Sequence, residues 1–208
     1  MPRLIDLPSY LLNLYTSFDS DAVSFRKNIR RYNNVLTYTS FGADINVIPG
    51  QGISDFRIYG QVYHRISLLL PEDGLQLAFA QLYIYDSEHK NANRHNVMPD
   101  LDNAILCNLL NMLDECNPYV QNFYRVRDLI QTNVPDKIFM VIHADRMRDP
   151  CRYNALSASE VATIMIGDGH DLHSSNRNII LRIRDKGLQR ISETHPSYDP
   201  LHYVLLFP

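Results

Sequence analysis

The sequence predicts an α+β fold, in which a mainly antiparallel sheet has a helical hairpin packed on one face. Two observations support this prediction. Strand-like segments occupy residues 56–86 and 178–192, and two adjacent segments with helical spacing of apolar residues, 101–116 and 117–130, lie between them. The chain has 208 residues, of which 45% are hydrophobic and 21% charged, so it is long enough to bury a core.

The first predicted helix follows an N-terminal segment, residues 1–19. Residues 20–31 begin with capping residues and then place three apolar side chains among basic ones, which favours a short amphipathic helix with a basic side. We expect Asn33 and Asn34 to end it. The glycines and the Pro-Gly pair of residues 42–52 then predict a loop or a tight hairpin.

A β-hairpin is predicted next. Residues 56–70 are rich in β-forming side chains, and Glu72-Asp73-Gly74 predicts a turn. Residues 75–86 then alternate between two faces, as a strand does. We therefore expect these two segments to pair with each other.

The helical hairpin has the clearest signals in the chain. Apolar residues recur at helical spacing over residues 101–116. Asn117 can cap a second helix and Pro118 is favoured at a first helical position, so the corner between the two helices is predicted at this pair. The second helix should bury one side between residues 120 and 130.

The last third of the chain predicts more strands. Residues 137–142 form a short apolar run of buried-strand length, and residues 160–166 fit either a strand or a helical turn. Residues 178–184 alternate, and Asp185-Lys186-Gly187 predicts a turn that pairs them with residues 188–192.

Composition limits the possible partners and compartments. The net charge of −3 and a pI near 6.2 give no global basic field, so any contact with DNA must come from local clusters. Cys107, Cys116 and Cys151 have no zinc or disulfide spacing and fit reduced thiols. No stretch approaches the roughly 20 apolar residues of a membrane span. We expect an intracellular protein, nuclear if it acts on DNA, with no membrane partner.

Five sequence blocks, in the same order, resemble the region upstream of the nuclease in Helitron proteins, the replication-initiator and helicase polypeptides of rolling-circle transposons. The resemblance spans residues 20–208. The blocks are RRYNNVLTYTSFGA (30–43), FRIYGQVYHRISLLLP (56–71), NPYVQNFYRVRDLI (117–130), IHADRMRDPCRYNALSASEVATIMIGD (142–168) and LQRISETHPSYDPLHYVLLFP (188–208).

The resemblance implies a truncated or domesticated Helitron-like protein with a non-catalytic accessory domain. In the family a nuclease and then a helicase follow a phrase like LLFP, and this chain stops before either. Single-stranded DNA and the nuclease and helicase domains of a full-length protein are the partners that the resemblance implies.

Catalytic motifs are missing from the sequence. The segments GQG (50–52) and GDG (167–169) each contain two glycines, but neither has the Gly-Lys-Ser/Thr ending that binds phosphates in nucleotide-binding loops. The sequence also has no His-hydrophobic-His pair. Tyr198 and Tyr203 lie upstream of where the family's nuclease begins, so we interpret them as packing residues. We expect no enzymatic activity and no cofactor.

A metal-dependent hydrolase is a further hypothesis, because histidines and carboxylates are metal ligands. The spacing of these residues fits no recognised site, and a polar surface loop explains them better, so we expect no metal. The residues considered are His143, Asp145, Asp168, His170, Asp171 and His173.

Basic residues are the remaining functional candidates. We expect Arg182, Arg184 and Arg190 to share one side of the hairpin at residues 178–192. A cationic strand face beside an aromatic ring can bind a phosphate backbone. The alternative is a solvated strand face, or salt bridges to acidic residues such as Asp185 and Glu193. The block that most resembles the family adds three further candidates for DNA binding: Tyr63, His64 and Arg65.

A protein-interaction or structural domain is the alternative function. Tyr203, Leu205 and Phe207 predict an apolar strand. An exposed apolar edge favours pairing with another chain, so such a domain would dock on the adjacent nuclease.

Overall fold

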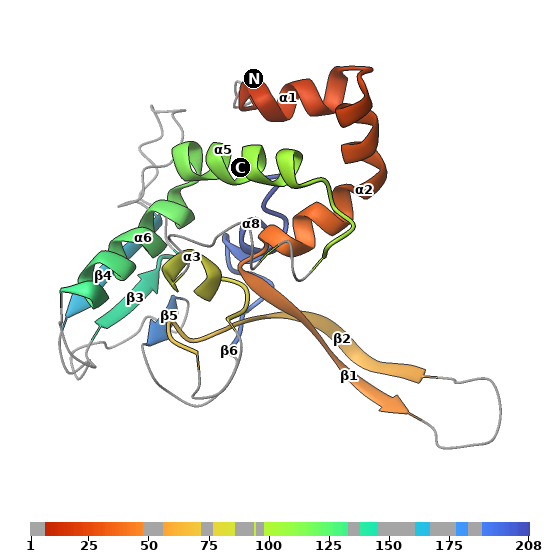
Figure 1. The fold of residues 1–208 in the computed structure, drawn as a ribbon. Helices are drawn as coiled ribbons and strands as arrows, with labels where there is room; N and C mark the ends of the chain where they lie inside the picture. The colour runs from red at the N-terminus through yellow and green to blue at the C-terminus, as the bar shows by residue number, and fades with distance from the viewer. Residues whose placement is uncertain are drawn as a thin grey trace, which may run out of the picture.

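The fold comes from a computed structural model, which describes residues 7–47, 56–71, 77–85, 94, 98–132, 138–144, 161–166, 178–182 and 189–208. Figure 1 shows how the elements are arranged. In chain order they are α1 (Ser9–Thr16), α2 (Ser20–Leu36), β1 (Thr39–Val47), β2 (Phe56–Ile66), α3 (Gln81–Tyr85), α5 (Asn103–Cys116), α6 (Pro118–Gln131), β3 (Ile138–Ile142), β4 (Ala162–Ile166), β5 (Ile179–Arg182), β6 (Gln189–Arg190) and α8 (Tyr198–His202).

The predicted α+β class is confirmed. The strands of the described residues form two antiparallel sheets of three strands each, sheet A in the order β1-β2-β6 and sheet B in the order β4-β3-β5. The helical hairpin is α5 and α6, and α6 lies against β4 of sheet B (Figure 1). One hydrophobic core joins side chains from α1, α2, α5, α6, both sheets and α8.

The corner between α5 and α6 forms at the predicted pair. The side chain of Asn117 accepts hydrogen bonds from the backbone N–H groups of Tyr119 at 2.9 Å and Val120 at 3.2 Å. Pro118 occupies the start of α6, where its missing N–H leaves no hydrogen bond unmade. Local capping chemistry therefore explains why this element was predictable.

Helix α2 is longer than predicted, because Asn33 and Asn34 do not end it. The Asn33 side chain donates to the backbone carbonyl of His202 at 2.8 Å and accepts from the N–H of Leu205 at 3.3 Å. A residue type that often ends helices is held inside this one by two bonds to a segment far along the chain. Such long-range bonds leave no local signal in the sequence.

The predicted pairing of residues 56–70 with residues 75–86 is wrong. β2 pairs instead with β1, which begins at Thr39. Of the two alternatives predicted for residues 42–52, a loop or a tight hairpin, this pairing agrees with the hairpin. Phe79 has a φ of 54°, which excludes a strand there, and residues 81–85 form the short helix α3. Gln81, Leu82, Tyr83 and Ile84 are all buried, and so short an apolar run cannot distinguish helix from strand by its period.

The predicted hairpin at residues 178–192 is also wrong. β5 pairs with β3, whereas β6 pairs with β2. The backbone N–H of Ile191 donates to the carbonyl of His64 at 2.9 Å, and the Ile191 side chain is buried in the core. Burial of the Ile191 side chain therefore stabilises the pairing of β6 with sheet A. The turn expected at residues 185–187 lies outside the described residues.

The final residues are not the predicted strand. Residues 203–208 follow α8 as a turn, in which Val204 and Leu205 are buried. The hydroxyl of Tyr15 in α1 donates to the carbonyl of Leu205 at 3.3 Å. The chain end therefore packs against the first helix instead of presenting an open edge.

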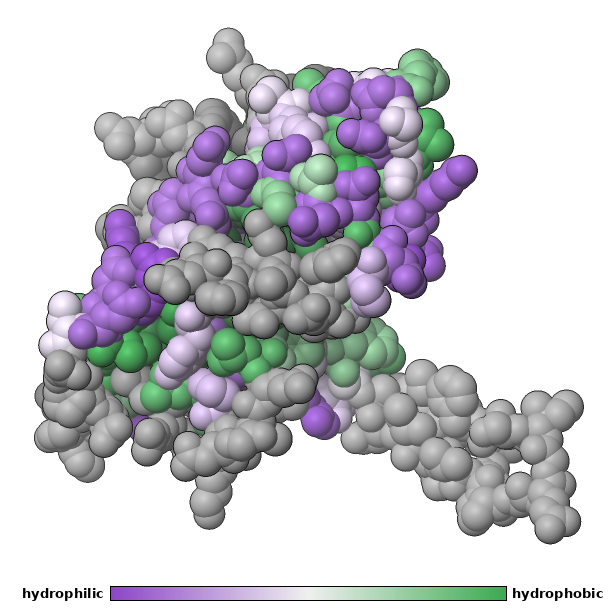
Figure 2. All heavy atoms as spheres, in the orientation of Figure 1, coloured by the Kyte–Doolittle hydropathy of each residue, from purple (hydrophilic) through white to green (hydrophobic). Residues whose placement is uncertain are grey.

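The surface over the helices differs in polarity from the surface below α6 (Figure 2). Hydrophilic side chains spread over the helices on the face shown in Figure 2, and apolar residues gather below α6, where α3 and β3 lie. None of the described helices combines the length and the apolar character that a bilayer span requires.

Candidate nucleic-acid interface

Two arginines face each other across sheet A. Arg65 of β2 and Arg190 of β6 are direct partners in the antiparallel register, so their side chains leave the same face of the sheet. The guanidinium carbon of Arg65 lies 4.8 Å from the centre of the Tyr63 ring, and that of Arg190 lies 4.4 Å from it. The guanidinium of Arg65 also donates a hydrogen bond to the Tyr63 hydroxyl. One tyrosine ring therefore holds two cations beside each other.

Gly42 of β1 makes room for this ring. It is the register partner of Tyr63, and a Cβ atom at this position would lie 2.6 Å from Cε2 of the ring and 3.1 Å from Nε of Arg65. No normal Cβ contact is that short, so only glycine lets the ring lie over β1. Tyr63 is consequently only 6% exposed.

Neither Arg65 nor Arg190 has an ion-pair partner within the described part of the chain, so Arg190 does not form the salt bridge to Glu193 that was considered as an alternative. Other arginines differ in this respect, since Arg31 pairs with Asp100 at 3.2 Å. Like charges directly opposite each other on neighbouring strands destabilise a sheet. Among the described residues no carboxylate offsets this repulsion, so an anion bound between the two guanidinium groups would be favourable.

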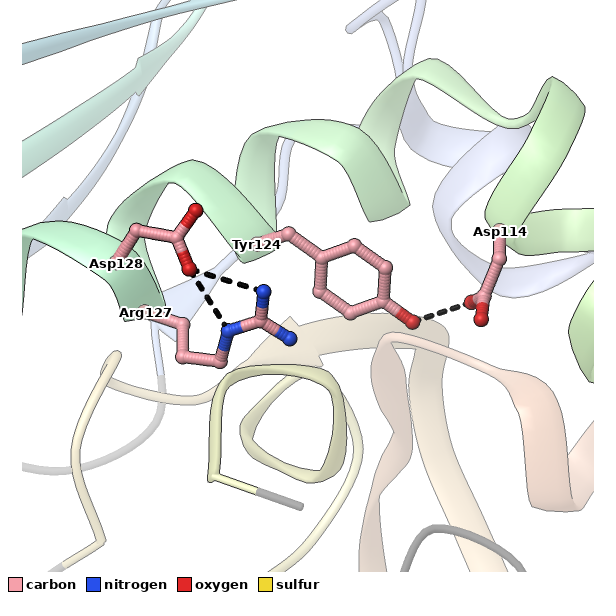
Figure 3. A network of polar contacts seen from close by, with 4 residues as sticks. All are labelled: Asp114, Tyr124, Arg127 and Asp128. Carbon is pink, nitrogen blue, oxygen red and sulfur yellow. Dashed lines mark hydrogen bonds and ion pairs between the residues drawn. The ribbon is translucent and has the colours of Figure 1, made fainter. Parts of the chain in front are cut away.

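A second arginine-over-tyrosine contact shows what a neutralised case looks like. In Figure 3, Arg127 of α6 lies by the ring of Tyr124, at 4.6 Å from its centre, and pairs with Asp128 at 2.9 Å. The Tyr124 hydroxyl donates to Asp114 of α5. Burial and then this hydrogen bond raise the pKa of Tyr124. Because a carboxylate already satisfies Arg127, this cluster supports the helical hairpin and needs no ligand.

His64 lies on the opposite face of sheet A and is 3% exposed, so it is not available to a ligand in this structure. Its ring stacks between Tyr198, at 4.2 Å between ring centres, and His202, at 3.9 Å. Nδ1 of His202 lies 2.9 Å from the hydroxyl oxygen of Thr39. This stack fixes α8 to the sheet, in agreement with the prediction that Tyr198 is a packing residue.

Two adjacent imidazoles inside a protein resist protonation. Burial and then the neighbouring His64 lower the pKa of His202 to about 4. Burial also lowers the pKa of His64, against an opposing effect of the Asp199 carboxylate. Both rings are therefore neutral at neutral pH, and the stack contributes no positive charge to the arginine face.

The predicted face of three arginines is not assembled as expected. Arg182 belongs to sheet B, where its guanidinium carbon lies 5.3 Å from the centre of the Phe139 ring, while Arg190 belongs to sheet A. Arg184 lies outside the described residues. The structure instead joins Arg190 to Tyr63 and Arg65, which were separate candidates in the sequence.

Among the other candidates, His143 has a local partner, since its Nε2 lies 2.8 Å from the hydroxyl oxygen of Thr163. Asp145, Asp168, His170, Asp171 and His173 lie outside the described residues. Within the residues that are described, no group of three or more metal-ligating side chains occurs.

Comparison with known proteins adds no assignment. No family model, no curated protein and no solved structure matches this chain. Sequence reasoning missed Gly42 as part of the site, because its segment was predicted as a loop or a tight hairpin and no partner strand was assigned to it. The signal that could have found it is strand pairing between β1 and β2, which no local pattern specifies.

Proposed function

We propose that this protein is a DNA-binding accessory domain that contacts phosphates through Arg65 and Arg190. The observation that carries the proposal is the pair of arginines opposite each other over Tyr63, without an acidic partner in the described residues. The resemblance to the Helitron region upstream of the nuclease supports the same role.

The chemistry of the two side chains suits a phosphate. A guanidinium presents its donors in a planar fork that matches phosphate oxygens, and stacking on an aromatic ring restricts its orientation before binding. A phosphate between Arg65 and Arg190 would offset their mutual repulsion. Arg190 is exposed and Arg65 partly exposed, so a ligand can reach both.

The proposed role is non-catalytic and needs no cofactor. Phosphate contacts position a protein on DNA without reading its sequence. In a Helitron-like protein such a domain would support the nuclease in recognising DNA, and its further partners would be the nuclease and helicase domains.

The test is binding of fluorescent single-stranded DNA, measured by anisotropy between about 50 and 200 mM salt. The double variant Arg65→Ala/Arg190→Ala should bind more weakly. Its plot of log affinity against log salt should be less steep by about 1.4, since each phosphate contact contributes about 0.7 on single strands. Arg127→Ala is the matched control, because that arginine also contacts a tyrosine ring but is paired with Asp128. Equal slopes for the wild type and the double variant would contradict the proposal.

A protein-docking domain is the second candidate, and one observation favours it. Leu206 is 62% exposed and Phe207 46% exposed, although the strand predicted at this place is absent. The variant Leu206→Ser/Phe207→Ser tests it by sedimentation of the protein at high concentration. Self-association in the wild type that the variant loses supports docking, and a wild type that stays monomeric opposes docking between copies of this chain.

A further inference from the structure

β1 and β2 continue beyond the arginine site as a two-stranded arm. In Figure 1 the two strands run away from the helices and from sheet B. In the antiparallel register of this arm, Asp44 lies opposite Tyr59, Ile45 opposite Ile58, Asn46 opposite Arg57 and Val47 opposite Phe56. In the described residues, β6 pairs with β2 at Arg65 and Ile66, which lie at the root of this arm.

An irregularity separates the arm from its root. The register changes between Gly42, which faces Tyr63, and Asp44, which faces Tyr59, so β2 has more residues than β1 in this interval. Bulges of this kind bend a ribbon and increase its twist. The arginine site therefore lies between the bulge and the helices, where β6 joins the sheet. The four outer residue pairs lie on the other side of the bulge.

We infer that the outer arm lies in the major groove of duplex DNA while Arg65 and Arg190 contact the phosphates that border the groove. The inference rests on the proposed function and specifies its ligand. Two strands lie about 4.8 Å apart, and four pairs at about 3.4 Å per residue extend roughly 14 Å. The major groove is about 12 Å wide and 8.5 Å deep, and it admits a two-stranded ribbon.

The arginine face is built for a duplex better than for a single strand. Proteins that bind single strands stack the bases on exposed aromatic rings. Here the ring of Tyr63 is only 6% exposed under the two guanidinium groups. The exposed Phe41 is the register partner of His64 and lies on the opposite face. Among the side chains described on the arginine face, the aromatic ring is that of Tyr63, and the two guanidinium groups cover it.

Charge agrees with this ligand. β2 contains two arginines, Arg57 and Arg65, and no acidic residue, whereas β1 contains one, Asp44. With Arg190 at the root, the strands at the site carry a net positive charge. The proposed ligand is thus a double-stranded polyanion that extends from the arginine pair along the arm.

The test compares a duplex with a single strand of equal length in the anisotropy assay. In the short-arm variant, an Asn-Gly turn replaces residues 44–59, which retains the register pair of Gly42 and Tyr63. The wild type should bind the duplex about tenfold more tightly than the single strand, and the short-arm variant should lose this preference while it retains its affinity for single strands. If the short-arm variant does not fold, Arg57→Glu in the full chain should lower duplex affinity by a similar factor.

The outcomes separate this inference from the proposed function. Equal binding of duplex and single strand by the wild type, or an unchanged duplex preference in a folded arm variant, would overturn the inference and leave the phosphate site in place. Wild-type affinity in Arg65→Ala/Arg190→Ala would instead overturn the proposed function, and the inference with it.

Discussion

Arg65 and Arg190 lie directly opposite each other on β2 and β6, each with its guanidinium group over the ring of Tyr63. The two residues are 125 positions apart in the sequence. Ile191 fixes their alignment, because its backbone bond to His64 and its burial hold β6 on sheet A. The arginine pair is therefore a product of core packing, and its charges can be changed without altering the core.

Neutralising one arginine should not destabilise the protein. Arg190→Gln removes an exposed cation from a like-charged pair, so the free energy of unfolding should stay constant or rise by up to about 0.5 kcal/mol. Urea unfolding at low salt measures it, and Arg31→Gln serves as the control because Arg31 has an acidic partner. A loss above about 1 kcal/mol for Arg190→Gln would mean that Arg190 is structural.

A side chain at Gly42 should disturb the site through Tyr63. Gly42→Ala places a Cβ atom 2.6 Å from the Tyr63 ring, and we expect a loss of about 1–3 kcal/mol in unfolding free energy from this overpacking. DNA affinity should fall as well, because the ring that orients both arginines must move.

A double-mutant cycle tests the cause of that loss. In a Tyr63→Ala background the clash is gone, so Gly42→Ala should cost little. An equal cost in both backgrounds would show that the effect lies in the β1 backbone and not in the contact with the ring.

Elements with local signals could be predicted from the sequence. Asn117 and Pro118 specify the corner of the helical hairpin through capping alone, and the apolar run of β3 is buried as expected. The α+β class followed from these elements. The strand pairings did not, because several pairings bury similar apolar faces, and the turn chemistry at residues 185–187 favoured a hairpin that β6 does not form.

The same limit applies to the candidate site. Tyr63, Arg65 and Arg190 were all candidates in the sequence, but their assembly depends on the pairing of β2 with β6. His64 was a candidate because of its neighbours in the sequence, whereas alternation along β2 places it on the other face, stacked on His202. The sequence therefore identified the side chains with suitable chemistry. Which of them lie together could be known only from the strand pairing.

Asn33 should be one of the most sensitive polar positions in α2. Its two bonds to the backbone of His202 and Leu205 hold the C-terminal segment on the helix. Asn33→Ala leaves these backbone groups without their partners, so we expect a loss of about 1–3 kcal/mol in urea unfolding. Asn34→Ala is the matched control, since Asn34 is the exposed neighbour on the same helix. Equal effects at both positions would mean that helix propensity, not the tertiary bonds, determines the result.

Stability should fall at mildly acidic pH through the stack of His64 and His202. Burial and His64 lower the pKa of His202 to about 4 in the folded protein, against about 6.5 when unfolded. The folded state therefore binds the proton less readily, and the stabilisation is fully present above about pH 6.5 and is lost as the pH falls toward 4. The groups facing the two rings are Tyr198, Tyr203, Thr39 and the carboxylate of Asp199. A hydrogen bond with the Tyr198 backbone and the charge of Asp199 favour protonation, and burial outweighs both.

The measurement is urea unfolding of the wild type and of His202→Gln at a series of pH values from 7 down to about 4.5. Each pKa unit is worth about 1.4 kcal/mol, so the wild type should lose on the order of 2 kcal/mol more than the variant over this range. Other ionisable groups are common to both proteins, so the difference between the two curves isolates the stack. Parallel curves would show that His202 does not titrate with folding, and that contacts other than the stacked imidazoles hold α8 on sheet A.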